Sequence, residues 1–249
     1  MLFDELKKEL KGEVYEDEQT LELYSHDTSL FELKPQVVVF PNDADDVKNI
    51  VKFVSARKKD NPKLSITARS GGTDMGGGAI NDSIILDFTK HINNIISLEN
   101  SQTQVEPGVL YRDFEKETQK QHLYLPSYPA SKNICALGGM INNNSGGEKS
   151  LVHGKTIDYV KSLKMVLADG NEYEFSKLNK KQLEQKLKQK NFEGEVYNKI
   201  YKLCEDNYDL IKGAKPKVSK NSTGYNIWDV WDKETFDLTK IFIGAQGTL

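Results

Sequence analysis

A glycine-rich stretch between two apolar segments constrains this chain more than any other feature. It runs Arg69-Ser70-Gly71-Gly72-Thr73-Asp74-Met75-Gly76-Gly77-Gly78, and the flanking residues 64–68 and 83–88 are predicted to be strands. Glycine accepts positive φ and lets a ligand approach the backbone, so such a loop can turn consecutive N–H groups toward one anion. The loop indicates a phosphate-bearing cofactor, in particular a dinucleotide. The alternative is a flexible hairpin tip.

The loop does not match two common nucleotide-binding patterns. A Rossmann fingerprint opens a helix and is followed about twenty residues later by an acidic residue, whereas this loop is predicted to join one strand to another. A P-loop requires a Lys directly after a glycine, and no glycine between residues 69 and 78 is followed by Lys. Neither a Rossmann site nor nucleoside-triphosphate chemistry is expected.

The composition narrows the classes of partner. The chain has 249 residues with a formal net charge of −3, and no basic block lies near the glycine loop. Nucleic acid is therefore not an expected partner. No window approaches about 18 consecutive apolar residues, so we expect no transmembrane segment, no signal peptide and a cytoplasmic protein. Cys135 and Cys204 share no metal-ligand spacing, so no metal site is expected and both should be buried.

The first third of the chain predicts a β-α-β unit. Residues 35–41 are typical of a short buried strand, and Asn42 or Asp43 then caps a helix. The apolar face of that helix is predicted to contain Val47, Ile50, Val51 and Val54. With the strand at residues 64–68, this arrangement places the glycine loop at the carboxyl end of a strand.

The second half predicts hairpins mixed with helices. Asp169-Gly170-Asn171 lies between apolar segments 162–168 and 172–175 and is a strong hairpin signal. Residues 177–189 form a solvated helix face or a linker, and one longer helix should carry Val196, Ile200, Leu203 and Ile211 on one side and end at Gly213. The insertion at about 177–215 is assigned a packing role. Residues 240–244 are predicted to be a buried strand.

A second cluster of small and amide residues follows the first by about sixty positions. It runs Ala136-Leu137-Gly138-Gly139-Met140-Ile141-Asn142-Asn143-Asn144-Ser145-Gly146-Gly147. Asn side chains offer both a donor and an acceptor, and glycines allow a flat ring to come close. Two such clusters suit one extended ligand. The alternative for the second cluster is a tight Asn/Gly turn.

Together these segments resemble the PCMH-type FAD-binding domain of the vanillyl-alcohol-oxidase superfamily, and specifically the branch of D-lactate dehydrogenases and glycolate oxidase D subunits. The resemblance extends from Tyr24 to Leu249. It rests on the glycine loop and on further markers: Tyr24-Ser25-His26-Asp27-Thr28-Ser29, Pro35 with Pro41-Asn42, Val105-Glu106-Pro107-Gly108-Val109, Leu137-Gly138-Gly139-Met140, His153-Gly154, Asn221-Ser222-Thr223-Gly224-Tyr225-Asn226 and Gly244-Ala245-Gln246-Gly247-Thr248-Leu249.

The resemblance implies an α+β fold in which FAD lies between two α/β subdomains, about 1–95 and about 96–249, of one domain that spans residues 1–249. It implies these cofactor-binding residues: Arg69, Ser70, Gly71, Gly72, Thr73, Asp74, Gly78, Ala79, Pro107, Gly108, Ser131, Gly138, Gly139, Asn142, Asn144, Gly146 and His153. Relatives with covalently bound flavin often carry His in the first loop. This loop has none, which implies non-covalent FAD.

The implied activity is FAD-dependent oxidation of a D-2-hydroxy acid such as lactate or glycolate, by hydride transfer to flavin N5. Such a reaction needs a base for the hydroxyl proton and a cation for the carboxylate. In the family a C-terminal substrate domain supplies them, and this chain is expected to be truncated before it, so its catalytic residues stay unassigned. An iron–sulfur domain or electron-transfer partner is also implied. The alternatives are a non-catalytic flavin-binding module that needs a partner chain, and a domain that has lost its ligand.

Overall fold

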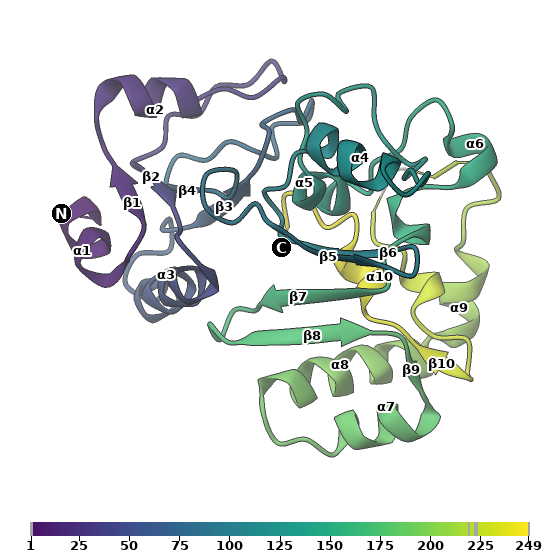
Figure 1. Cartoon of the computed structure of the whole chain (residues 1–249). Coiled ribbons are helices and arrows are strands. Elements are labelled where there is room, and N and C mark those ends of the chain that lie inside the picture. Colours follow the sequence, from purple (N-terminus) through teal and green to yellow (C-terminus); the bar gives the residue numbers. More distant parts are fainter. Residues whose placement is uncertain (1, 219, 222–223, 249) are drawn as a thin grey trace.

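A four-stranded sheet forms the N-terminal part of the computed structural model, which describes residues 2–218, 220–221 and 224–248 (Figure 1). Its strand order is β1-β2-β4-β3, with β1 antiparallel to β2 and the other neighbours parallel. The elements of this part are α1 (Leu2–Glu9), β1 (Glu13–Tyr15), α2 (Glu18–Tyr24), β2 (Val37–Phe40), α3 (Ala44–Arg57), β3 (Ile66–Arg69) and β4 (Ile84–Asp87).

The predicted β-α-β unit is confirmed by β2, α3 and β3. Asp43 is the N-cap of α3, and its side chain accepts hydrogen bonds from the backbone N–H groups of Asp45 and Asp46. Ile50, with other residues of α1, α3 and the sheet, forms one buried core. Ile50 and Val54 of the predicted face, together with Phe53, therefore hold the helix against the sheet, whereas Val47 and Val51 are only half-buried and are not in this core.

The glycine loop joins β3 to β4, and these two strands lie side by side in parallel. Arg69, the last residue of β3, is opposite Asp87, the last residue of β4. The chain must therefore travel back along the length of the strand before β4 begins. A hairpin tip joins antiparallel strands, so the hairpin-tip alternative is wrong for this loop.

Three two-stranded ladders, β5-β6, β7-β8 and β9-β10, follow in the second part of the described chain (Figure 1). The elements are β5 (Ile95–Glu99), β6 (Gln102–Val105), α4 (Tyr111–Gln119), α5 (Leu137–Asn142), α6 (Ser150–His153), η1 (Thr156–Asp158), β7 (Ser162–Val166), β8 (Glu172–Ser176), β9 (Leu178–Asn179), α7 (Lys180–Leu187), α8 (Phe192–Asp206), α9 (Tyr208–Gly213), η2 (Ile227–Asp229), β10 (Thr235–Phe236) and α10 (Thr239–Phe242). The boundary near residue 95 stays a prediction.

The hairpin predicted at Asp169-Gly170-Asn171 is confirmed by β7 and β8, which pair from Ser162 with Ser176 to Val166 with Glu172. Gly170 adopts a φ of +70° in the turn. The turn also reaches the first part of the fold, because the Ser55 hydroxyl on α3 donates to the carbonyl of Ala168 at 2.6 Å. The hairpin thus connects the two parts of the molecule.

Two predictions about the second part are wrong. The single long helix is two helices, α8 and α9, that meet at Asn207, and Leu203 is exposed rather than packed. Residues 240–244 are not a strand, because Asp237 accepts hydrogen bonds from the Thr239 backbone and hydroxyl and starts the short helix α10. Phe242 and Ile243 are buried as expected, but burial of a short apolar run does not distinguish a strand from a helix.

Cys135 and Cys204 are both buried, as their isolation in the sequence indicated. In the part of the chain that the structure describes, no helix combines the length and the apolar character that crossing a bilayer requires.

The Glu13 carboxylate on β1 should make stability depend on pH in the acidic range. Lys90, Tyr15 and His91 all bond it, and they lower the pKa of Glu13 from 4.5 to about 2. A carboxyl with a depressed folded-state pKa adds stability above its unfolded pKa and loses it as pH falls through the folded value.

We therefore expect Glu13→Gln to cost up to about 1 kcal/mol of unfolding free energy near pH 5, a small value because exposed ion pairs are screened by solvent. That difference should shrink as pH is lowered toward 2, in urea titrations of the parent and the variant. A difference that stays constant from pH 5 to pH 2 would contradict the assignment.

Candidate cofactor-binding cleft

A cleft of about 2400 Å³ lies between the glycine loop and the second part of the fold. Its walls come from segments on both sides of residue 95: α3, β3 and the glycine loop on one side, and β5, β6, α5 and β7 on the other. Pockets for drug-sized ligands measure roughly 300–1,000 Å³. The cleft therefore has room for an extended ligand such as a dinucleotide.

The first half of the glycine loop presents free backbone donors to this cleft. Ser70, Gly72 and Thr73 all line it. Within the described residues, no protein acceptor pairs with the backbone N–H groups of these three. Gly72 has a φ of +62°, the left-handed conformation that favours glycine. Consecutive unpaired N–H groups in such a turn form a site for an anion.

The second half of the loop satisfies its own donors. The Asp74 carboxylate accepts the backbone N–H groups of Gly76 at 2.8 Å and of Gly78 at 2.7 Å. Burial would raise the pKa of Asp74, but the Gly78 amide, the Gln246 side chain and the Gly76 amide outweigh it and lower that pKa below its usual value. Asp74 is thus ionised and organises the second half of the loop through the Gly76 and Gly78 amides.

The two glycine clusters meet in space. A Cβ on Gly139 would lie 2.6 Å from the Ser70 hydroxyl oxygen, and a Cβ on Gly71 would lie 2.3 Å from the Ile134 carbonyl oxygen. Pro107 packs equally closely on Gly138, whose N–H donates to the Pro107 carbonyl at 2.8 Å. Side chains at these glycines would separate the clusters, so the glycines permit the close approach that one shared site requires.

A third segment, residues 244–248, closes one end of the cleft. The Gln246 backbone N–H donates to the Asn142 carbonyl at 3.0 Å, and its side-chain oxygen accepts from Asn143 at 3.0 Å. A Cβ on Gly78 would lie 2.5 Å from the Gln246 amide nitrogen. Gln246 was not predicted as a site residue, although the family marker around it was noted. Ser222, Thr223 and Leu249 of the other markers lie outside the described residues.

Most of the residues that the resemblance implies line the cleft: Arg69, Ser70, Gly72, Thr73, Asp74, Gly78, Ala79, Pro107, Ser131, Gly138, Gly139 and Asn142. Five others do not: Gly71, Gly108, Asn144, Gly146 and His153. The Gly108 Cα faces the Phe88 carbonyl, where a Cβ would approach to 1.9 Å. Buried Asn144 accepts the Ile157 N–H at 3.0 Å, and His153 is exposed on α6.

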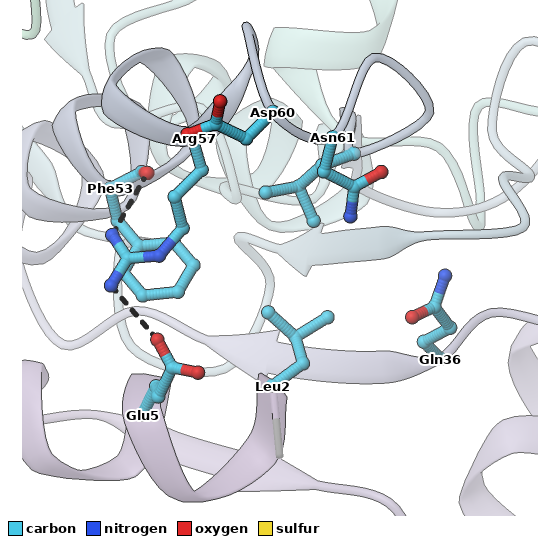
Figure 2. A pocket seen from close by; sticks show the side chains of 8 residues that line it. Leu2, Glu5, Gln36, Phe53, Arg57, Asp60 and Asn61 are labelled. Carbon is cyan, nitrogen blue, oxygen red and sulfur yellow. Dashed lines mark hydrogen bonds and ion pairs between the residues drawn. The ribbon is translucent and has the colours of Figure 1, made fainter.

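A smaller cavity of about 290 Å³ lies elsewhere, between α1 and the end of α3. Arg57 lines this cavity and bonds Glu5 at 2.8 Å and the Phe53 carbonyl at 3.3 Å (Figure 2). The Arg57 guanidinium also stacks 3.6 Å from the centre of the Phe53 ring. No residue of either glycine cluster lines this cavity, so it is not part of the cofactor cleft.

Comparison with known proteins agrees with this geometry. Residues 35–176 match the family described as FAD binding domain. D-2-hydroxyglutarate dehydrogenase of Escherichia coli (strain K12) is 34% identical over 239 residues, which are 94% of this chain and 23% of that protein. The glycolate oxidase subunit GlcD of Bacillus subtilis (strain 168) is 29% identical over 91% of this chain and 37% of its own length.

Solved structures share the fold. The 6-hydroxy-D-nicotine oxidase of Arthrobacter nicotinovorans aligns with a TM-score of 0.58 and 27% identity, over 67% of this chain and 36% of that one. The chain spans about a quarter of the length of the D-2-hydroxyglutarate dehydrogenase from Escherichia coli. The free N–H groups and close-packed glycines of the cleft fit the diphosphate and the flat ring of FAD. The family match covers more than half of the sequence, and the chain belongs to the FAD binding domain family of the vanillyl-alcohol-oxidase superfamily.

Proposed function

We propose that this chain supplies the FAD-binding part of an oxidoreductase that oxidises a D-2-hydroxy acid. The observation that carries the proposal is that Ser70, Gly72 and Thr73, whose N–H groups are free, line a cleft large enough for a dinucleotide. These groups would hold the FAD diphosphate, and Pro107, Gly138, Gly139 and Asn142 would lie along the rest of the cofactor. D-2-hydroxyglutarate dehydrogenases, a glycolate oxidase subunit and D-lactate dehydrogenases are among the similar proteins and support this substrate class.

Bound FAD would supply a hydride acceptor at flavin N5. The protein's own part is to bind and orient: the loop N–H groups would stabilise the diphosphate charge by hydrogen bonds, and the glycines would keep side chains away from the ring. A D-2-hydroxy acid also needs a cation for its carboxylate and a base for its hydroxyl proton. We include in the proposal that another domain or partner provides them, and that an iron–sulfur domain or another electron-transfer partner takes the electrons onward.

A second candidate is a flavin-binding module without turnover of its own, and the arginines favour it. The sequence contains three arginines. Arg57 pairs with Glu5, Arg69 donates to three backbone carbonyls, and Arg112 donates to the Asn133 carbonyl. Each of the three guanidinium groups thus already bonds a protein group.

Non-covalent FAD predicts a specific result for the purified chain. Its visible spectrum should show a flavin, and acid precipitation should leave the yellow colour in the supernatant because the first loop has no His to form a bond. Colour that stays with the pellet would contradict non-covalent binding. A colourless chain that does not take up added FAD would contradict the site itself.

The two candidates differ in the next measurement. D-2-hydroxyglutarate, D-lactate and glycolate are each added anaerobically to the FAD-loaded chain while flavin absorbance is followed. Bleaching by one D-2-hydroxy acid, and not by its L-enantiomer where one exists, supports the oxidoreductase. Loaded flavin that no acid bleaches supports the module.

A further inference from the structure

The Arg69 guanidinium lies at the start of the glycine loop and donates hydrogen bonds to backbone carbonyls. Its Nη1 lies 2.7 Å from the His26 carbonyl, 3.2 Å from the Ala79 carbonyl and 3.4 Å from the Tyr24 carbonyl. Arg69 precedes the loop and Ala79 follows it. One side chain therefore ties together the two ends of the loop and a segment more than forty residues earlier in the chain.

Tyr24 and Asp87 hold this guanidinium in its orientation. It stacks on the Tyr24 ring, with Cζ 4.9 Å from the ring centre. The Tyr24 hydroxyl donates to the buried Asp87 carboxylate at 2.7 Å, and the other oxygen of Asp87 accepts from the backbone and hydroxyl of Thr89. Asp87 is the register partner of Arg69 on the neighbouring strand. The end of the sheet thus fixes Tyr24, and Tyr24 fixes Arg69.

The segment held by Arg69 then covers the second half of the loop. The Thr28 backbone and hydroxyl both donate to the Asp74 carbonyl, at 3.1 and 2.6 Å. The Phe31 ring lies where a Cβ on Gly77 would come within 3.0 Å. Contacts from this segment and from the Asp74 carboxylate therefore hold residues 74–78, while the N–H groups of Ser70, Gly72 and Thr73 stay free.

Gly72 rests directly on the guanidinium. A Cβ on Gly72 would lie 2.6 Å from Arg69 Nη2 and 3.0 Å from Cζ. Nη1 is occupied by carbonyls and Nη2 lies beside Gly72, so both amino groups lie against the backbone of the loop and its neighbours. We infer that Arg69 is a positioning residue, which sets the anion-binding shape of the glycine loop through the segment Tyr24–Phe31 and does not itself contact the phosphates; this inference rests on the proposed FAD site.

The test compares Arg69→Met with a matched control, Arg112→Met, which removes an arginine that also donates to a backbone carbonyl but lies outside the loop. Binding of FAD, ADP and riboflavin to the apo chain is measured for each. We expect Arg69→Met to weaken FAD and ADP by a similar factor, about tenfold to a hundredfold, because both carry a diphosphate. Riboflavin, which has no phosphate, should keep its affinity, and the control should change none of them.

A purely structural role would weaken all three ligands together, and that result would overturn the inference. Unchanged FAD affinity would overturn it too. Hydrogen exchange of the Gly76 and Gly78 amides, which donate to the Asp74 carboxylate, provides a readout in the ligand-free chain: it should accelerate in Arg69→Met and not in the control. If the parent binds no FAD, the proposed site fails while the exchange result still decides whether Arg69 positions the loop.

Discussion

Gly72→Val is expected to leave a folded chain that no longer binds FAD. Valine strongly disfavours a φ of +62°. Its Cβ would also lie 2.6 Å from Nη2 of Arg69. The loop must shift, so its free N–H groups can no longer converge on one anion. Loss of two hydrogen bonds to a charged phosphate corresponds to at least a hundredfold loss of affinity, by about 1.5–3 kcal/mol for each bond.

The measurement is FAD content after purification, followed by titration with added FAD. Gly213→Val is the matched control, because it adds the same side chain where nothing lies within 4 Å and φ is not positive. The far-ultraviolet circular dichroism of both variants should match that of the parent. Equal flavin content in Gly72→Val and the parent would refute the assignment of this loop to FAD.

Asp46→Ala is expected to have the largest effect on stability. Asp46 is fully buried, and its carboxylate accepts the backbone N–H groups of Lys11 at 2.9 Å, of Gly12 at 2.8 Å and of Asn42 at 2.8 Å. It thereby joins the connection between α1 and β1 to the start of α3. Removing a charged acceptor that serves several donors should cost about 3 kcal/mol of unfolding free energy.

Urea denaturation of the chain measures this cost. Asp45→Ala is the neighbouring control, since Asp45 is exposed and its ion pairs with Lys48 and Lys11 lie at the surface, where such pairs are worth about 1 kcal/mol or less. A loss for Asp46→Ala no larger than that for Asp45→Ala would show that the three hydrogen bonds do not hold the N-terminal segment.

Local signals in the sequence were sufficient to predict several of the elements. The apolar run before Pro41, the acidic cap at Asp43 and the turn at Asp169-Gly170-Asn171 each gave an element that the structure contains. Weaker signals were missed. The hairpin β5-β6 turns at Asn100 and Ser101, both with positive φ, and the first of its strands, β5, lacks a regular alternation of exposed and half-buried residues.

The errors have a common cause. Residues 240–244 are apolar and buried, but the hydrogen bonds from Thr239 to the Asp237 side chain start a helical turn there. In the same way, the periodicity of α8 and α9 is continuous while the backbone breaks at Asn207. Composition and period report burial, and they do not report which backbone hydrogen bonds form.

For the candidate site too, some features follow from the sequence and others from the folded structure. The sequence by itself determined that residues 69–78 form a glycine-rich loop whose backbone a ligand can approach closely. Positive φ and close approach depend on the residues of the loop alone. Only the tertiary structure decided how that loop is held, because the Arg69 side chain, the Asp74 carbonyl and Gly77 contact His26, Thr28 and Phe31, more than forty residues away. The shape of this loop depends on its neighbours in space, and folding brings those neighbours together.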